Sequence, residues 1–115
     1  MEILEMLKLD NPNDFCQWLQ DNHKTEEGIW LAFYKKSSGK QTLTIAQAVE
    51  EALCFGWIQS RLKPLDAEHF AVRFSPRREG SSWSLPNLKR ARKLIAQGRM
   101  TEAGMAVLPP EFVSK

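Results

Sequence analysis

The segment TIAQAVEEALCFG, residues 44 to 56, limits most strongly what this chain can fold into. Thr44 and Gln47 have the spacing of a capping box, and Gly56 is a natural stop for a helix. Between them the apolar residues follow the i, i+3, i+4, i+7, i+8 spacing of one helical face: Ile45, Ala48, Val49, Ala52 and Leu53. The pattern predicts an amphipathic helix whose apolar face must pack against other elements.

The segments around this helix alternate between strand and helix patterns. The aromatic-rich run GIWLAFYKK predicts a strand, and its apolar residues on both faces place it at the centre of a sheet. Pro64 keeps the strand before it from being central. Strands are predicted over 28–36, 57–65 and 69–75, the last two as a hairpin, and further helices over 11–22, 84–98 and briefly from Thr101. The fold class is therefore α+β, with a small antiparallel sheet of three or more strands packed against helices.

Size and cysteine content favour one domain in a reducing compartment. The chain has 115 residues, of which 43% are apolar, enough for one hydrophobic core. Cys16 and Cys54 form no CxxC pair and do not suggest a disulfide scaffold. The first ten residues carry acids where a signal peptide carries cations, and no apolar stretch approaches the ~20 residues of a membrane span. We expect a cytoplasmic protein.

Charge is distributed unevenly along the chain. The net charge is +2, but residues 73–99 hold eight basic residues and one acid, Glu79. A basic final third on an acidic body is suited to attract a small anion, an acidic protein partner or a nucleic acid.

Several residues that could carry chemistry have plainer interpretations. The spacing of Cys16, Cys54, His23 and His69 matches no known zinc ligand set, so no metal site is expected. Cys54 is interpreted as a buried small hydrophobe. Glu50 and Glu51 are adjacent on a helix, where side chains diverge by about 100°, and are interpreted as solvated charges. No cofactor and no catalytic signature is predicted.

The stretch FSPRREGSSWSLPN, residues 74 to 87, is the candidate site. If 69–75 is a strand, Phe70, Val72 and Phe74 point to one face and Arg73 and Ser75 to the other. Arginines at the strand end and backbone N–H groups of the helix capped by Ser84 would form a corner for a carboxylate or phosphate-like group. The structural alternative is that Trp83 plugs the core, Ser84 is only a cap, and the arginines pair with acids such as Asp66 or Glu68.

Four motifs resemble, in order, the N-terminal domain of the YdeI/OmpD-associated (bacteriocin-protection) family. They are GIWLAFYKKSSG, AVEEALCFGWIQS, VRFSPRREGSSWSLPN and LIAQGRMTEAG. The resemblance implies a bacterial α+β domain grouped with YjbR/CyaY-like proteins, and a role in tolerance of bacteriocins, antimicrobial peptides or envelope stress. It implies no enzymatic activity and no cofactor.

The sequence departs from that family at two points, and each affects which family properties can be expected here. Gln59 stands where the family usually has Asp, so a role for an acid there does not carry over. Longer members continue past PPE, residues 109–111, into a second helical domain, and residues 1–115 are expected to form the single N-terminal-type domain alone.

Together these arguments predict a non-enzymatic binding module with an anion-binding corner. Its predicted binding residues are Trp57, Arg73, Ser75, Arg77, Arg78, Ser82, Trp83, Ser84 and Asn87. The alternative is a nucleic-acid-binding domain that uses the basic helix 84–98 and the PRR loop, residues 76–78. The oligomeric state is left open.

Overall fold

The computed structural model describes residues 6–7, 9, 11–35, 39, 43–77 and 83–109. In chain order its elements are β1 (Met6–Leu7), α1 (Pro12–Asn22), β2 (Ile29–Tyr34), α2 (Ile45–Cys54), β3 (Trp57–Pro64), β4 (His69–Pro76), α3 (Leu85–Ala96) and α4 (Glu102–Ala106). The predicted helices and strands are all confirmed. The two-residue strand β1 was not predicted, because two residues are too few to carry a periodic pattern.

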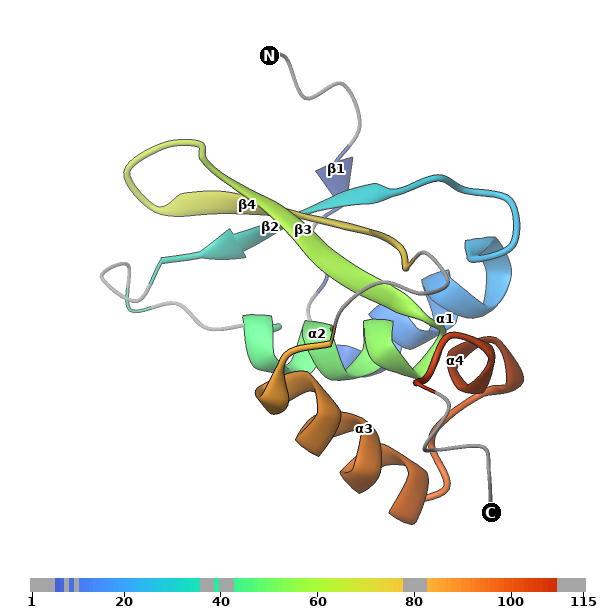
Figure 1. The fold of residues 1–115 in the computed structure, drawn as a ribbon. Coiled ribbons are helices and arrows are strands. Elements are labelled where there is room, and N and C mark those ends of the chain that lie inside the picture. Colours follow the sequence, from blue (N-terminus) through green and yellow to red (C-terminus); the bar gives the residue numbers. More distant parts are fainter. Residues whose placement is uncertain are drawn as a thin grey trace.

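The sheet has the order β1-β2-β4-β3. β2 and β4 are antiparallel, β4 and β3 form the predicted antiparallel hairpin, and β1 adds to β2 in parallel. β2 is thus central, as predicted, and β3 is an outer strand of the sheet (Figure 1). The fold class is α+β.

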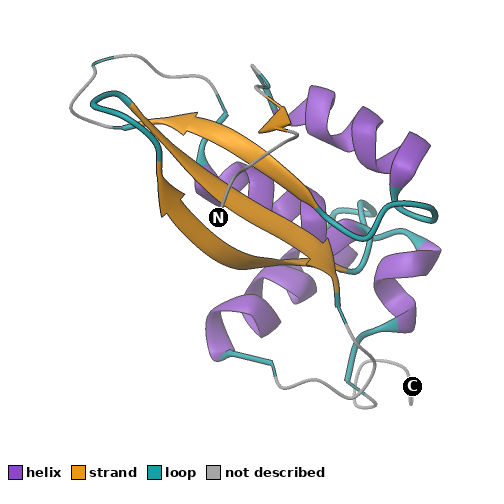
Figure 2. Cartoon of the chain, turned by 90° about the horizontal axis from the view of Figure 1, so that it is seen from above, coloured by secondary structure: helices purple, strands orange, loops and turns teal. Residues whose placement is uncertain are grey.

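The described helices all lie on one face of the sheet, as the two views show (Figure 1, Figure 2). α2 packs against α1, α3, α4 and β3. Its predicted capping box is present, since the Thr44 and Gln47 side chains each accept the other residue's backbone N–H at 3.1 Å. The predicted apolar stripe is buried at Ala48, Val49, Ala52 and Leu53.

The core lies between the sheet and the helices. Val72 and Phe74 of β4 face it with no exposed area, and Arg73 and Ser75 point to the opposite, outer face, as predicted. Phe74 meets Phe15 of α1 edge to face, with ring centroids 5.4 Å apart. Period-two patterning in β4 thus separates the apolar core from the charged outer face.

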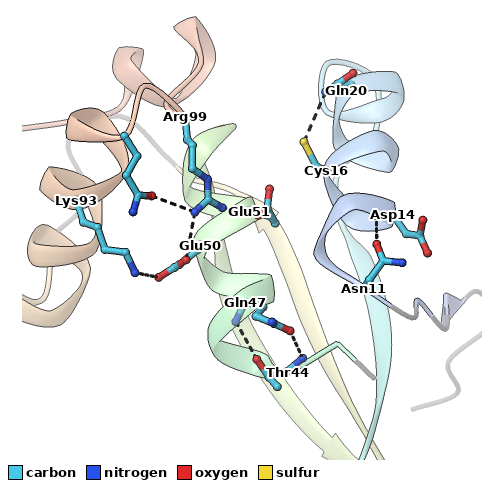
Figure 3. A network of polar contacts seen from close by, with 11 residues as sticks. Asn11, Asp14, Cys16, Gln20, Thr44, Gln47, Glu50, Glu51, Lys93 and Arg99 are labelled. Carbon is cyan, nitrogen blue, oxygen red and sulfur yellow. Dashed lines mark hydrogen bonds and ion pairs between the residues drawn. The ribbon is translucent and has the colours of Figure 1, made fainter. Parts of the chain in front are cut away.

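The interpretation of Glu50 and Glu51 as solvated charges is wrong. Both turn toward Arg99, which donates a hydrogen bond to Glu51 and lies 3.5 Å from Glu50, and the Glu51 side chain is only 11% exposed. Lys93 of α3 donates to Glu50 at 2.8 Å (Figure 3). That hydrogen bond lowers the pKa of Glu50 against the opposing effect of burial. These cations come from α3 and the segment after it, so the sequence of α2 alone does not reveal them.

α4 is fixed to the end of α2 by two features. Thr101 caps α4 and also donates its hydroxyl and backbone N–H to the Cys54 carbonyl. Gly104 lies so close to that carbonyl that a β-carbon would collide with it. The glycine that weakens α4 as an isolated helix is therefore required by packing.

Among the described residues, none of the helices has the length and hydropathy that a membrane span requires.

Candidate ligand-binding cleft

A cleft of about 810 Å³ opens between α2, β3 and the first turn of α3. We call it the β3 cleft. Its described lining residues are Ile45, Ala46, Val49 and Leu53 of α2, Ile58, Gln59, Ser60, Arg61 and Leu62 of β3, and Ser84, Pro86, Asn87 and Arg90 at the start of α3. Its volume is in the range of small-molecule and peptide-residue pockets.

The edge of β3, and not one of its faces, borders the cleft. Side chains alternate along a strand, so a cleft against one face would be lined by every second residue. Five consecutive residues, 58–62, line this one. A register irregularity between Gln59 and Arg61 marks a bulge at Ser60, whose hydroxyl donates to the Arg73 carbonyl at 3.2 Å. The bulge bends the strand where the cleft passes it.

The floor of the cleft is apolar, and of two exposed leucines one lines the cleft and the other lies beside it. Val49 and Leu53 are buried core residues of α2 that reach its base. Leu62 is 56% exposed within the cleft, and Leu85, between the lining residues Ser84 and Pro86, is 72% exposed. Large apolar side chains at such exposure mark a surface suited to bind another apolar group.

The rim of the cleft is cationic. Among its described lining residues are Arg90 on the helix side and Arg61 on the strand edge, and no acid; Arg61 is the register partner of Arg73, so its side chain points to the outer face of the sheet. The Asn87 side-chain oxygen accepts from Arg90 at 3.0 Å, which orients the guanidinium. Ser84 accepts the backbone N–H of Asn87 at 3.3 Å and is thus the predicted helix cap. Asn87 positions Arg90 in addition to lining the cleft.

Those predicted site residues that the structure describes do not gather in one pocket. Ser84 and Asn87 line the β3 cleft. Trp57 is 1% exposed on the core side, where its ring meets Trp18 edge to face at 5.7 Å. Arg73 and Ser75 are on the other face of the sheet, with the Arg73 guanidinium against Gly28. Because the sheet lies between them, Trp57 and Arg73 do not share a binding site.

Arg77 and Trp83 form a separate pair. The Arg77 guanidinium carbon lies 3.9 Å from the centroid of the Trp83 ring, and Arg77 is 6% exposed. Burial lowers the pKa of Arg77. Trp83 is half-buried and packs against the core, which is close to the structural alternative in which Trp83 plugs the core. Arg78 and Ser82, also predicted site residues, lie outside the described residues.

Sequence reasoning missed the part of the site that β3 contributes. Arg61 and Leu62 were not predicted as site residues, because their exposure at a cleft depends on α2 lying beside β3, although Pro64 correctly predicted that β3 is not a central strand. Gln59 was noted only as a departure from a family pattern. Arg90 was assigned to a general basic helix face. The available signal was a leucine beside an arginine in a strand that Pro64 keeps from the centre of the sheet.

Two further titratable groups, Asp66 and Cys54, are explained by their local surroundings. Asp66 accepts from His69 and from the backbone N–H of Glu68, in place of an arginine. Burial, followed by the charge of Glu51, raises the pKa of Cys54 to about 11, which agrees with a buried, unreactive thiol. In the described part of the chain, no three His, Cys, Asp or Glu residues cluster as metal ligands.

A family described as Domain of unknown function (DUF8412) matches residues 7–107. No curated protein and no solved structure gives a significant match.

Proposed function

This chain is a member of the family described as Domain of unknown function (DUF8412), and for this member we propose a non-enzymatic binding module that takes an anionic group of a partner in the β3 cleft. The observation that carries the proposal is the pairing of an apolar floor with two arginines and no acid among the described lining residues. Arginine forks hold carboxylates and phosphates, and an apolar floor adds affinity that a bare anion cannot use. The ligand therefore combines acidic and apolar groups.

An acidic protein partner fits this chemistry better than a free small anion. The cleft includes the exposed Leu62, and Leu85 beside the lining residues Ser84 and Pro86 adds exposed apolar surface, together more than a sulfate-sized ion would cover. The resemblance to the YdeI/OmpD-associated family adds a context to the proposal, tolerance of bacteriocins or envelope stress in the cytoplasm. Since amphipathic antimicrobial peptides are rich in Lys and Arg, a cationic cleft favours action through an acidic partner over direct capture of the peptide.

Titration of the labelled protein with two capped hexapeptides, monitored by amide NMR, tests the proposal. One peptide alternates Glu and Val, the other Lys and Val. We expect shifts in the β3 cleft with the Glu peptide only. Arg61→Gln and Arg90→Gln should each weaken binding about tenfold. The control is Lys89→Gln, since Lys89 is exposed on α3 and is not among the lining residues. Equal binding of both peptides, or none, contradicts the proposal.

Nucleic-acid binding is the second candidate, on a different surface from the one the sequence favoured. On α3, Lys93 is paired with Glu50, and Arg90 bonds Asn87. The outer face of the sheet carries cations and aromatic rings from neighbouring strands and no acid at the described outward strand positions. Its residues are Trp30 and Tyr34 of β2, Arg61 and Lys63 of β3, and Arg73 of β4. Stacking rings with cations beside them suit single-stranded nucleic acid.

Fluorescence polarisation with a 12-nucleotide single strand at several salt concentrations separates the two candidates. Sheet-face binding would weaken steeply with salt and be lost in Trp30→Ala and Arg73→Gln. It would persist in Arg90→Gln, which removes a cleft arginine only. No binding at low salt would eliminate this candidate and leave the cleft proposal untouched.

A further inference from the structure

The outer strand β3 has a backbone edge that no described strand covers. In the sheet order β1-β2-β4-β3, β3 pairs on one side only, along eight residues from Trp57 to Pro64. An uncovered edge of this length is a template for another strand.

The hydrogen-bond register identifies which backbone groups face outward. The Arg77 N–H bonds the Gly56 carbonyl, and the Leu65 N–H bonds the His69 carbonyl. In an antiparallel pair, residues alternate between bonding the partner strand and pointing away from it. Counting from these two bonds on either side of the bulge at Ser60, the N–H and C=O groups of Gln59 and Leu62 point away from β4. Both residues line the β3 cleft and are exposed.

We propose that the β3 cleft receives an extended acidic peptide segment of a partner protein, which adds as a further strand to the edge of β3. The inference rests on the proposed function and specifies its ligand. A strand edge on one side and an apolar helix wall on the other is the geometry by which strand addition binds peptides. Residues 58–62 along the edge accommodate about five peptide residues, or about 16 Å of strand.

The chemistry of the cleft defines the peptide. Alternate side chains of an added strand would point toward Val49 and Leu53, which favours apolar residues at every second position. The residues between them would point to the outer face of the sheet, beside Arg61, which favours Asp or Glu. A second copy of this chain is a poor occupant, since pairing β3 with itself would bring Arg61 and Lys63 against like charges.

N-methylated versions of the Glu-Val hexapeptide test the backbone contacts directly. Each residue of an added strand directs its N–H either toward β3 or away from it, in alternation. Methylation of one alternating set should weaken binding at least tenfold, and methylation of the other set should leave it nearly unchanged. Equal binding of both methylated peptides would overturn strand addition and leave the proposed function intact. If the unmodified peptide fails to bind, both proposals are overturned.

Two variants of Leu62 give an independent readout. Leu62→Pro removes an N–H that points to the edge, and proline is tolerated at such positions of outer strands. Leu62→Ala retains the N–H and shortens the side chain. We expect Leu62→Pro to lose the peptide and Leu62→Ala to weaken it only a few-fold. Full binding by a folded Leu62→Pro, or concentration-dependent dimers without peptide in sedimentation, would contradict the inference.

Discussion

The guanidinium carbon of Arg77 lies 3.9 Å from the ring centroid of Trp83, which ties the end of β4 to the residue before the cap of α3. Arg77 also donates its backbone N–H to Gly56 at 2.8 Å. The arginine is thus anchored at the start of β3, and the tryptophan packs on the core. The pair fixes where α3 begins, and with it the α3 side of the β3 cleft.

Trp83→Ala should lower the free energy of unfolding by about 2–3 kcal/mol, less than a fully buried tryptophan, because Trp83 is half-buried. Arg77→Lys should cost about 1 kcal/mol, since an ammonium keeps the charge but loses the planar contact. Urea unfolding of both variants and of the double variant measures the coupling between them. Strictly additive effects would show that the stacked pair contributes nothing to stability.

Gly104→Ala should destabilise the protein by about 2–3 kcal/mol, because the new methyl group would collide with the Cys54 carbonyl. Gly98→Ala is the matched control. Gly98 has a φ of +71° and open space around it, so the same substitution costs only the backbone strain of about 1 kcal/mol. Thermal unfolding measures the stability of the two variants. An equal loss of stability would show that the close approach of α4 to α2 is not rigid.

Lys93→Met should raise the pKa of Glu50, because the hydrogen bond from Lys93 is the main cause of its lowered value. A carboxyl whose pKa is lower in the folded than in the unfolded state stabilises the fold at pH values above the unfolded-state pKa, usually 4.5. This contribution is lost as the pH falls through the folded-state pKa. The stability difference between wild type and variant should therefore be largest near neutral pH and vanish in acid. NMR titration of Glu50 measures the pKa in both proteins. A stability difference between wild type and variant that does not change with pH would show that the Lys93–Glu50 ion pair is not its cause.

Cys54 should react with a disulfide reagent at pH 8 at least about 100-fold more slowly in the folded protein than in urea, because only a thiolate reacts and burial suppresses its formation. The physical basis is a pKa raised to about 11 in a side chain that is 2% exposed. Cys16→Ser isolates this thiol for the measurement. Rapid modification of the folded variant would contradict the buried, unreactive interpretation.

The cleft could be predicted only in part. Ser84 and Asn87 are recognisable because a helix cap and its first turn are encoded within four residues. Arg61 and Leu62 could not be recognised, since Pro64 predicts that β3 is not central but nothing in the sequence places α2 beside it. The residues of the predicted anion-binding corner lie on two faces of the sheet. The sequence could not show this either, because it depends on the direction of the side chains in the assembled fold.

The sequence by itself determined the helices, the strands other than β1, the caps and the inward and outward faces of β4, because these depend on contacts within a few residues along the chain. Tertiary structure alone decided the partners of the charged residues and the location of the cleft. Glu51 appeared solvated until the segment after α3 placed Arg99 against it. Contacts between residues more than forty positions apart depend on strand order and helix packing, and local periodicity carries no information about either.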